Sequence, residues 1–108
     1  MAVFAVFTYV VKLDRMNEQM AFVADFKAWI KKRPDLFKGM KAWTVYSKLA
    51  GGKFGEFVEI AEYENLTELE KNYAAVMQDK EYLTKHYPTM VGLFVPGTLG
   101  MEIWNSVP

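Results

Sequence analysis

The 108-residue sequence contains no cysteine and only one histidine, His86. Without cysteine the chain has no disulfide, no Cys-ligated zinc and no thiol nucleophile, and this composition fits a cytoplasmic protein. The 13 basic and 13 acidic side chains cancel, so no net positive charge favours a nucleic acid or an anionic membrane as a partner. Several classes of functional site are therefore excluded before any motif is considered.

Long apolar runs and nucleotide-binding motifs are also missing. The first apolar run, Ala2 to Val11, has about half the length that spans a bilayer, and no basic segment precedes it. We interpret it as a β-strand and not as a signal sequence. No phosphate loop, dinucleotide fingerprint, serine nucleophile elbow or metal-ligand spacing occurs. Gly51 and Gly52 separate two strand-like segments, which predicts a turn.

Aromatic side chains, by contrast, are abundant. They make up 16% of the chain, and seven methionines accompany them. Each aromatic side chain buries a large area, whereas a domain of this size has a limited interior. We therefore expect a subunit interface or a ligand pocket to take up some of them, with a densely aromatic core as the alternative. The methionines are candidates for adaptable core positions first, and for the wall of a pocket second.

Hydrophobic periodicity and turn signals predict the order strand, helix, strand, strand, helix, strand. Pro34 ends the first helix, Asn65 and Glu68 form a capping box at the start of the second, and Pro88 predicts a break in it. The predicted ranges are 2–12, 17–32, 40–49, 54–63, 65–90 and 99–105. This order is that of one α+β domain over residues 1–108, a ferredoxin-like β-α-β-β-α-β fold with a four-stranded antiparallel sheet.

The first predicted strand is apolar on both of its faces. Phe4, Val6 and Val10 lie on one face, and Val3 and Phe7 lie on the other. A strand of this kind needs cover on both sides. Helices can cover one face and a second copy of the chain the other, so we expect a homodimer.

Two segments resemble the dimeric α/β-barrel superfamily, which includes the antibiotic-biosynthesis monooxygenase, EthD-like and NIPSNAP-like families. They are Lys38 to Trp43, at the entry to the second strand, and Glu59 to Leu66, at the exit from the third. With the element order and the length, the resemblance covers nearly the whole chain. It implies that two four-stranded sheets face each other across a dimer and form a barrel.

Members of this superfamily range from cofactor-independent monooxygenases and isomerases through haem-degrading enzymes to proteins without known activity. The resemblance implies an apolar small-molecule pocket and a cofactor-independent monooxygenase or isomerase acting on an aromatic or polyketide-like compound. A non-enzymatic binding or stress-related dimeric module is the alternative. Haem binding or degradation is a minority alternative. The haem-degrading members carry a histidine on the helix of His86, but they also use a first-strand asparagine, where this chain has Thr8 and Tyr9.

Glu59 is the carboxylate that we expect to act as a general acid or base. Strand alternation puts it on the face opposite Glu56 and Glu62, which argues against a metal site built from the three. Phe57 and Tyr63 share its face, and burial among them would raise its pKa and suit proton transfer. The alternative is an exposed strand end or an ion pair between subunits.

The remaining candidates are one histidine and a group of aromatic residues. His86 is a second catalytic candidate because imidazole titrates near neutral pH and binds metals, with a surface or helix-cap role as the alternative. Aromatic side chains with a polar tip can line a small-molecule pocket, although core or interface positions are also common for them. The predicted pocket residues are Tyr46, Tyr73, Tyr82 and Trp104.

Overall fold

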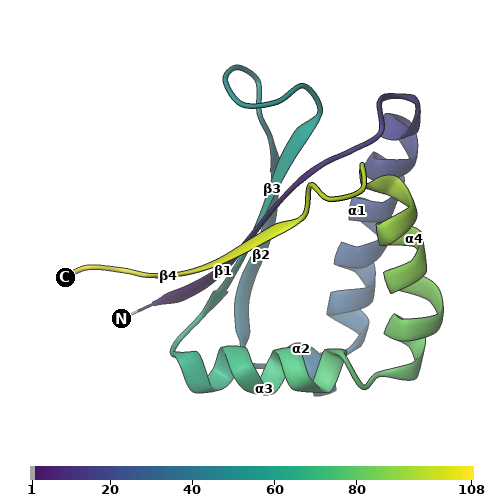
Figure 1. Cartoon of the computed structure of the whole chain (residues 1–108). Coiled ribbons are helices and arrows are strands. Elements are labelled where there is room, and N and C mark those ends of the chain that lie inside the picture. The colour runs from purple at the N-terminus through teal and green to yellow at the C-terminus, as the bar shows by residue number, and fades with distance from the viewer. Residues whose placement is uncertain (1) are drawn as a thin grey trace.

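Four antiparallel strands form one sheet, and the helices all lie on one of its faces (Figure 1). The computed structural model describes residues 2–108. The order across the sheet is β2-β3-β1-β4, so β1 and β3 are the central pair. This is the ferredoxin-like arrangement predicted from the sequence. The strands are β1 (Val3–Val10), β2 (Met40–Ser47), β3 (Glu56–Tyr63) and β4 (Gly100–Asn105).

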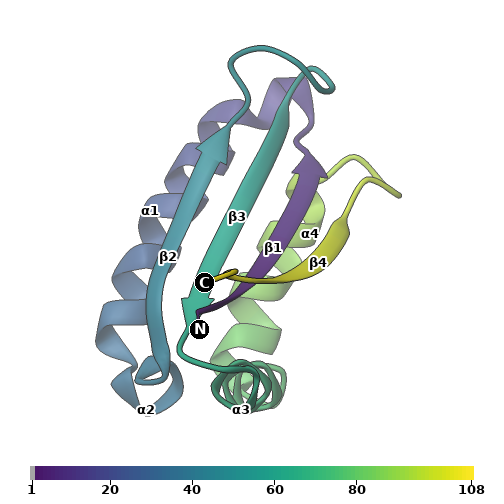
Figure 2. The ribbon, with the colours of Figure 1, turned by 90° about the vertical axis from the view of Figure 1, so that its left-hand side faces the viewer.

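Two longer helices and several short ones complete the fold. Helices α1 and α4 run alongside the sheet, and α3 lies across one end of it (Figures 1 and 2). A π-helical turn, η2, leads directly into α4. The helical elements are η1 (Leu13–Arg15), α1 (Met16–Lys32), α2 (Pro34–Phe37), α3 (Leu66–Val76), η2 (Tyr82–His86) and α4 (Tyr87–Leu93).

Helix ends follow the predicted signals. The Asn65 side chain accepts a hydrogen bond from the backbone N–H of Glu68 at 2.9 Å, which confirms the cap of α3. Pro88 occupies the first turn of α4, where its missing N–H is tolerated, so the predicted break is confirmed. Gly51 and Gly52 adopt positive φ angles of 80° and 68° in the β2–β3 turn, a conformation that favours glycine.

The core lies between the sheet and α1, and aromatic residues dominate it. All but two of its buried members are aromatic: Tyr9, Val11, Phe22, Phe26, Trp29, Phe37, Phe57, Tyr82, Leu93 and Phe94. Phe26 is central, with ring contacts to six neighbouring aromatic or imidazole rings. The densely aromatic core weighed from composition is therefore present.

One turn of α1 buries a polar residue and exposes an apolar one. Met20 is 54% exposed, whereas Gln19 next to it has 0% of its surface exposed. The residues that face the sheet are Gln19, Phe22, Phe26 and Trp29, which repeat at helical spacing. The polar side chain of Gln19 thus occupies a core position, where it forms a hydrogen bond with Tyr9.

Among residues 2–108, no helix lies over the second face of the sheet (Figure 2). Strand pairing places Val6, Thr44 and Ile60 side by side on this face. It is apolar at its centre and carries the half-exposed rings of Tyr46 and Trp104 nearer its edges. No helix among residues 2–108 combines the length and the apolar character needed to cross a membrane.

Candidate active site

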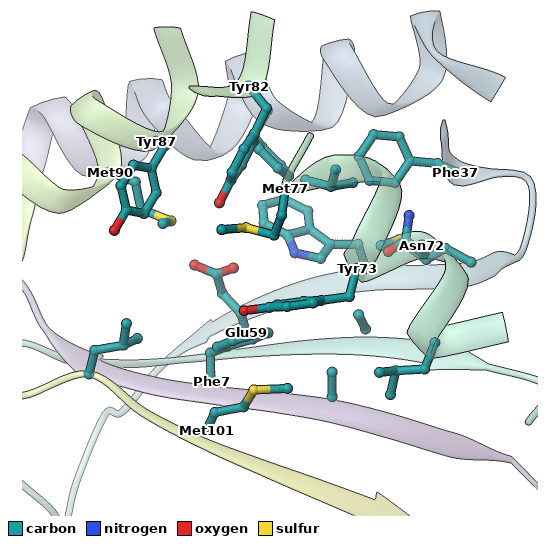
Figure 3. Close-up of a pocket in the computed structure, with 18 of the residues that line it drawn as sticks. Phe7, Phe37, Glu59, Asn72, Tyr73, Met77, Tyr82, Tyr87, Met90 and Met101 are labelled. Carbon is teal, nitrogen blue, oxygen red and sulfur yellow. The ribbon is translucent and has the colours of Figure 1, made fainter. Parts of the chain in front are cut away.

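A cavity of about 270 Å³ lies between the helix-covered face of the sheet and the helices α3, η2 and α4 (Figure 3). Its floor includes Phe7 of β1 and Glu59 of β3, which the strand register places opposite each other. Its roof includes Tyr82 and Met77. The volume lies just below the range of roughly 300–1,000 Å³ that is usual for small-molecule sites.

The cavity opens to solvent between the end of α3, the start of α4 and β4. The lining residues at this entrance are partly exposed, whereas Tyr9, Phe94 and Trp43 line the interior. The entrance residues are Tyr73, Met77, Tyr87, Leu99 and Met101. An apolar ligand can therefore enter past aromatic and methionine side chains.

Glu59 is the only acidic residue among the described residues that line the cavity. It is 8% exposed, and its carboxylate projects from the sheet toward Tyr82 (Figure 3). Burial raises the pKa of Glu59, and hydrogen bonding from Tyr9 and Trp43 opposes that rise only in part. A carboxyl group with a raised pKa in a cavity is suited to give or take a proton.

Tyr9 holds the carboxylate from below. Its hydroxyl donates a hydrogen bond to Glu59 Oε2 at 2.5 Å and accepts one from Gln19 Nε2 at 2.9 Å. The Tyr9 ring stacks on Phe94, with centroids 4.2 Å apart, and on Phe57 at 6.0 Å. The buried polar residue of α1 is thus linked to the candidate acid or base through one phenol, and burial raises the pKa of that phenol.

Three further tyrosines surround Glu59. In Figure 3 the hydroxyl groups of Tyr73, Tyr82 and Tyr87 point into the cavity around its carboxylate. Burial raises the pKa of Tyr82 to about 12, and the charges of Glu59, Tyr87 and Tyr73 add to that rise. Within residues 2–108, none of these three hydroxyls has a hydrogen-bond partner in the protein. They are free to donate to an oxygen of a ligand.

A second polar pair closes the far end of the cavity. The Tyr63 hydroxyl donates to Asn72 Oδ1 at 2.5 Å, and Asn72 Nδ2 donates to the backbone carbonyl of Leu36 at 2.8 Å. Burial raises the pKa of Tyr63 to about 12. Because the hydrogen-bonding capacity of these groups is used within the protein, we assign them to joining α3, β3 and α2.

The structure brings three of the predicted site residues together and separates the others from them. Glu59, Tyr73 and Tyr82 all line the cavity. Tyr46 and Trp104 were expected to line it too, but they lie on the opposite face of the sheet. Tyr46 pairs with Val58, and Trp104 pairs with Phe4, so all four side chains point away from the helices. Their assignment to the pocket is therefore corrected.

His86 is buried, so the surface or cap position given as the alternative to a catalytic role is wrong. It is 3% exposed, and its ring packs on Trp29, with centroids 4.4 Å apart, and edge-on to Phe26. It is not among the residues that line the cavity. Burial lowers the pKa of His86, with the charge of Lys85 acting in the same direction, so the ring is neutral at neutral pH.

This position does not fit a haem held by His86, because an iron atom could reach the imidazole only by displacing the rings packed on it. Nor do residues 2–108 contain a group of three or more acidic, histidine or cysteine side chains placed to hold a metal ion. The ionisable side chains that line the cavity are one carboxyl group and several phenols.

Tyr9 and Gln19 are joined to Glu59 by hydrogen bonds, and the sequence reasoning did not place either of them in the candidate site. Tyr9 was noted only as the residue that stands where haem-degrading proteins have asparagine. The available signal for Gln19 was its spacing, since it precedes Phe22, Phe26 and Trp29 on one helical stripe. A polar residue in a buried stripe indicates a buried partner, although the sequence alone does not say which.

No model of a known protein family matches this sequence, and no curated protein sequence matches it. Solved structures do. A NIPSNAP family protein from Agrobacterium tumefaciens is 12% identical, with 99% of this chain and 94% of that one covered and a TM-score of 0.73. SnoaB, a cofactor-independent oxygenase from Streptomyces nogalater, is 17% identical, with 97% and 92% covered and a TM-score of 0.68.

A third similar structure is a dimeric protein of unknown function and ferredoxin-like fold from Bacteroides fragilis. It is 12% identical, with 97% of this chain and 96% of that one covered and a TM-score of 0.64. At these identities the likeness establishes the fold alone. The neighbours do include a NIPSNAP protein and an oxygenase of the kind that the sequence resemblance names.

Proposed function

We propose that this protein is a small-molecule enzyme of the cofactor-independent monooxygenase or isomerase kind, acting on an apolar, aromatic substrate. The observation that carries the proposal is one buried carboxyl group, Glu59, in a cavity whose other polar groups include tyrosine hydroxyls and the amide of Asn72. Glu59 acts as the general base or acid.

The surroundings of Glu59 suit removal of a proton from carbon or from a phenol. Aromatic and methionine walls bind a flat apolar body, and the raised pKa makes the carboxylate a stronger base than an exposed one. Removing a proton next to a carbonyl group leaves negative charge on oxygen. The hydroxyls of Tyr73, Tyr82 and Tyr87 are placed to donate hydrogen bonds to that charge.

The comparisons support this proposal. SnoaB shares the fold and is described as a cofactor-independent oxygenase. One fold serves many functions, so the residues of the cavity carry more weight than this likeness. A non-enzymatic binding module is the competing function, because the same cavity can bind a ligand without transforming it.

We further propose that the protein is a homodimer in which the two bare sheet faces meet and form a barrel. The apolar centre of that face supports this, and so does the dimeric neighbour from Bacteroides fragilis. Sedimentation is expected to give about twice 12.5 kDa. A cytoplasmic location also belongs to the proposal, supported by the absence of cysteine.

Hydrogen exchange at carbon tests the reaction directly. The protein is incubated with 2-tetralone, an aromatic ketone with acidic α-hydrogens, in D2O, and loss of the α-hydrogen signals is followed by proton NMR. We expect saturable exchange above the buffer rate, reduced at least about 100-fold in Glu59→Gln. The matched control is Glu64→Gln, an exposed residue just beyond the same strand, which should leave the rate unchanged.

Oxygen uptake and product analysis in the same mixture then separate a monooxygenase from an isomerase. If 2-tetralone binds and the wild-type protein catalyses no exchange, proton transfer from this class of ketone is refuted. Binding that survives in Glu59→Gln without any turnover would favour the non-enzymatic module.

A further inference from the structure

A chain of three buried polar groups runs from α1 to the cavity. Gln19 and Tyr9 are 0% and 1% exposed, and Glu59 is 8% exposed. Gln19 Nε2 lies 2.9 Å from the Tyr9 oxygen, which lies 2.5 Å from Glu59 Oε2. Buried polar groups are costly unless they are paired, and Gln19 Oε1 has no partner within residues 2–108. The buried amide of Gln19 therefore needs a physical explanation.

Counting donors and acceptors shows which group donates in each of these two hydrogen bonds. An amide NH₂ can only donate, so the Tyr9 oxygen accepts from Gln19. A phenol has one proton, and this proton is left for Glu59. The ring of Tyr9 cannot turn away easily because Phe57 and Phe94 stack on it. Oε2 of Glu59 is therefore always an acceptor.

We propose that Gln19 and Tyr9 are positioning residues that reserve Oε2 of Glu59 as an acceptor, so that any proton Glu59 carries is on Oε1. Oε1 is then the atom that exchanges protons with a ligand in the cavity. The role in catalysis rests on the function proposed above, but the hydrogen-bond direction does not. The ligand must bring a hydrogen-bond donor or an acidic C–H to Oε1.

The other titratable groups that face Glu59 are all phenols. Tyr9 faces it from β1, Tyr73 from α3, Tyr82 from η2 and Tyr87 from α4. No lysine or arginine among the described residues lines the cavity. A change in the protonation of Glu59 on removing the Tyr9 hydroxyl can therefore be read without interference from a nearby cation.

Carbon-13 NMR of protein labelled at the glutamate carboxyl carbons tests whether Tyr9 donates its hydrogen bond to Glu59 or accepts one from it. The Glu59 signal is the one that disappears in Glu59→Gln, and its pKa is read from a pH titration. A phenol that donates to the charged carboxylate stabilises it, so Tyr9→Phe should raise the pKa of Glu59 by about one unit or more. Gln19→Met should raise it by less, because the Tyr9 hydroxyl becomes a weaker donor.

The control is Tyr63→Phe, which removes a buried hydroxyl from the same face of the sheet but one bonded to Asn72. It should leave the pKa of Glu59 unchanged. A fall in this pKa in Tyr9→Phe would overturn the proposal, since it would mean that protonated Glu59 donates to Tyr9 through Oε2. An unchanged pKa in Tyr9→Phe would overturn it as well.

If Tyr9→Phe does not fold, Gln19→Met tests the positioning role instead. An unchanged pKa of Glu59 in Gln19→Met would refute the proposed hydrogen-bond series from Gln19 through Tyr9 to Glu59. The titration needs no substrate, so it separates the two proposals. A shifted pKa with no exchange of 2-tetralone leaves the positioning role standing and removes the proposed reaction. Where exchange is catalysed, its pH profile in Tyr9→Phe should move upward with the pKa of Glu59.

Discussion

The two faces of the sheet are built from the same strands, but helices cover only one of them. On the helix-covered face, β1 and β3 contribute Phe7, Tyr9 and Glu59 to an aromatic core with a cavity in it. On the bare face, the alternate residues Val6 and Ile60 lie side by side, and the carboxylates of that face lie around them at Glu56, Glu62 and Glu102. The comparison teaches that burial, and not the presence of a carboxylate, distinguishes the covered face: Glu59 is buried beside a cavity, whereas the carboxylates of the bare face are more exposed.

The largest expected effect is a loss of stability when an aromatic ring is removed from the core on the helix-covered face. Phe26→Ala removes the ring that touches Trp29, Phe37 and Trp43, among others, and should lower the free energy of unfolding by about 3–5 kcal/mol. Urea denaturation measures this loss. Tyr46→Ala, on the bare face, is the control and should cost under about 1 kcal/mol in the monomer, since its ring is half exposed. Equal losses would contradict the contrast between the faces.

A charge at the centre of the bare face should act on assembly instead. Ile60→Lys places an ammonium group beside Val6 and Thr44, where the proposed partner sheet would desolvate it. We expect the dimer affinity to fall by about 2 kcal/mol or more, roughly 30-fold, in sedimentation equilibrium. Lys80→Glu, remote from the sheet, should leave it unchanged. A wild-type monomer at micromolar concentration would refute the barrel.

A smaller effect, a gain in stability, is expected when the carboxyl group of Glu59 at the floor of the cavity is replaced. The folded state holds the proton of Glu59 more tightly than the unfolded chain, so stability is lost as pH rises from the unfolded pKa through the folded one. Glu59→Gln removes this loss and should stabilise the protein by about 1 kcal/mol at pH 7, with no gain at pH 3. Thermal unfolding at both pH values checks this. A destabilised variant at pH 7 would show that the charged carboxylate supports the fold.

The smallest expected effect concerns His86. Its pKa is lowered in the folded state, so stability is fully present above the unfolded value near 6.5 and declines as pH falls through the folded one. His86→Gln should flatten the part of the stability profile between pH 7 and 5 that this group causes. Chemical denaturation at each pH measures it. An unaltered slope would mean that His86 does not titrate in this range.

Much of the fold could be predicted because local signals agree with it. The Asn65 cap, the Gly51-Gly52 turn and Pro88 each mark a boundary that the structure keeps. Strand alternation correctly separated Glu59 from Glu56 and Glu62. These features depend on residues close together in the chain, where propensity and hydrogen bonding act directly.

The site was predicted less completely, for two physical reasons. Alternation divides a strand into two faces but does not say which face the helices cover, and so Tyr46 and Trp104 were placed on the wrong one. The Tyr9–Glu59 pair joins residues 50 positions apart, and only the sheet register brings them together. His86 was nominated from the chemistry of imidazole, whereas its burial depends on the π-helical turn that it ends.

That π-helical turn also determines how the entrance is built. Tyr82 and Tyr87 are five positions apart, a spacing that a regular α-helix would rotate well off one side at about 100° per residue. In η2 the hydrogen bond from Tyr87 N–H reaches the Tyr82 carbonyl, and the two rings lie with centroids 6.0 Å apart. If the same residues were wound as a regular α-helix, Tyr87 would point about 140° away from Tyr82 around the helix axis and so away from the opening, while the amino-acid composition of the wall stayed intact. Access to Glu59 thus depends on the winding of one helical turn as much as on the chemistry of its residues.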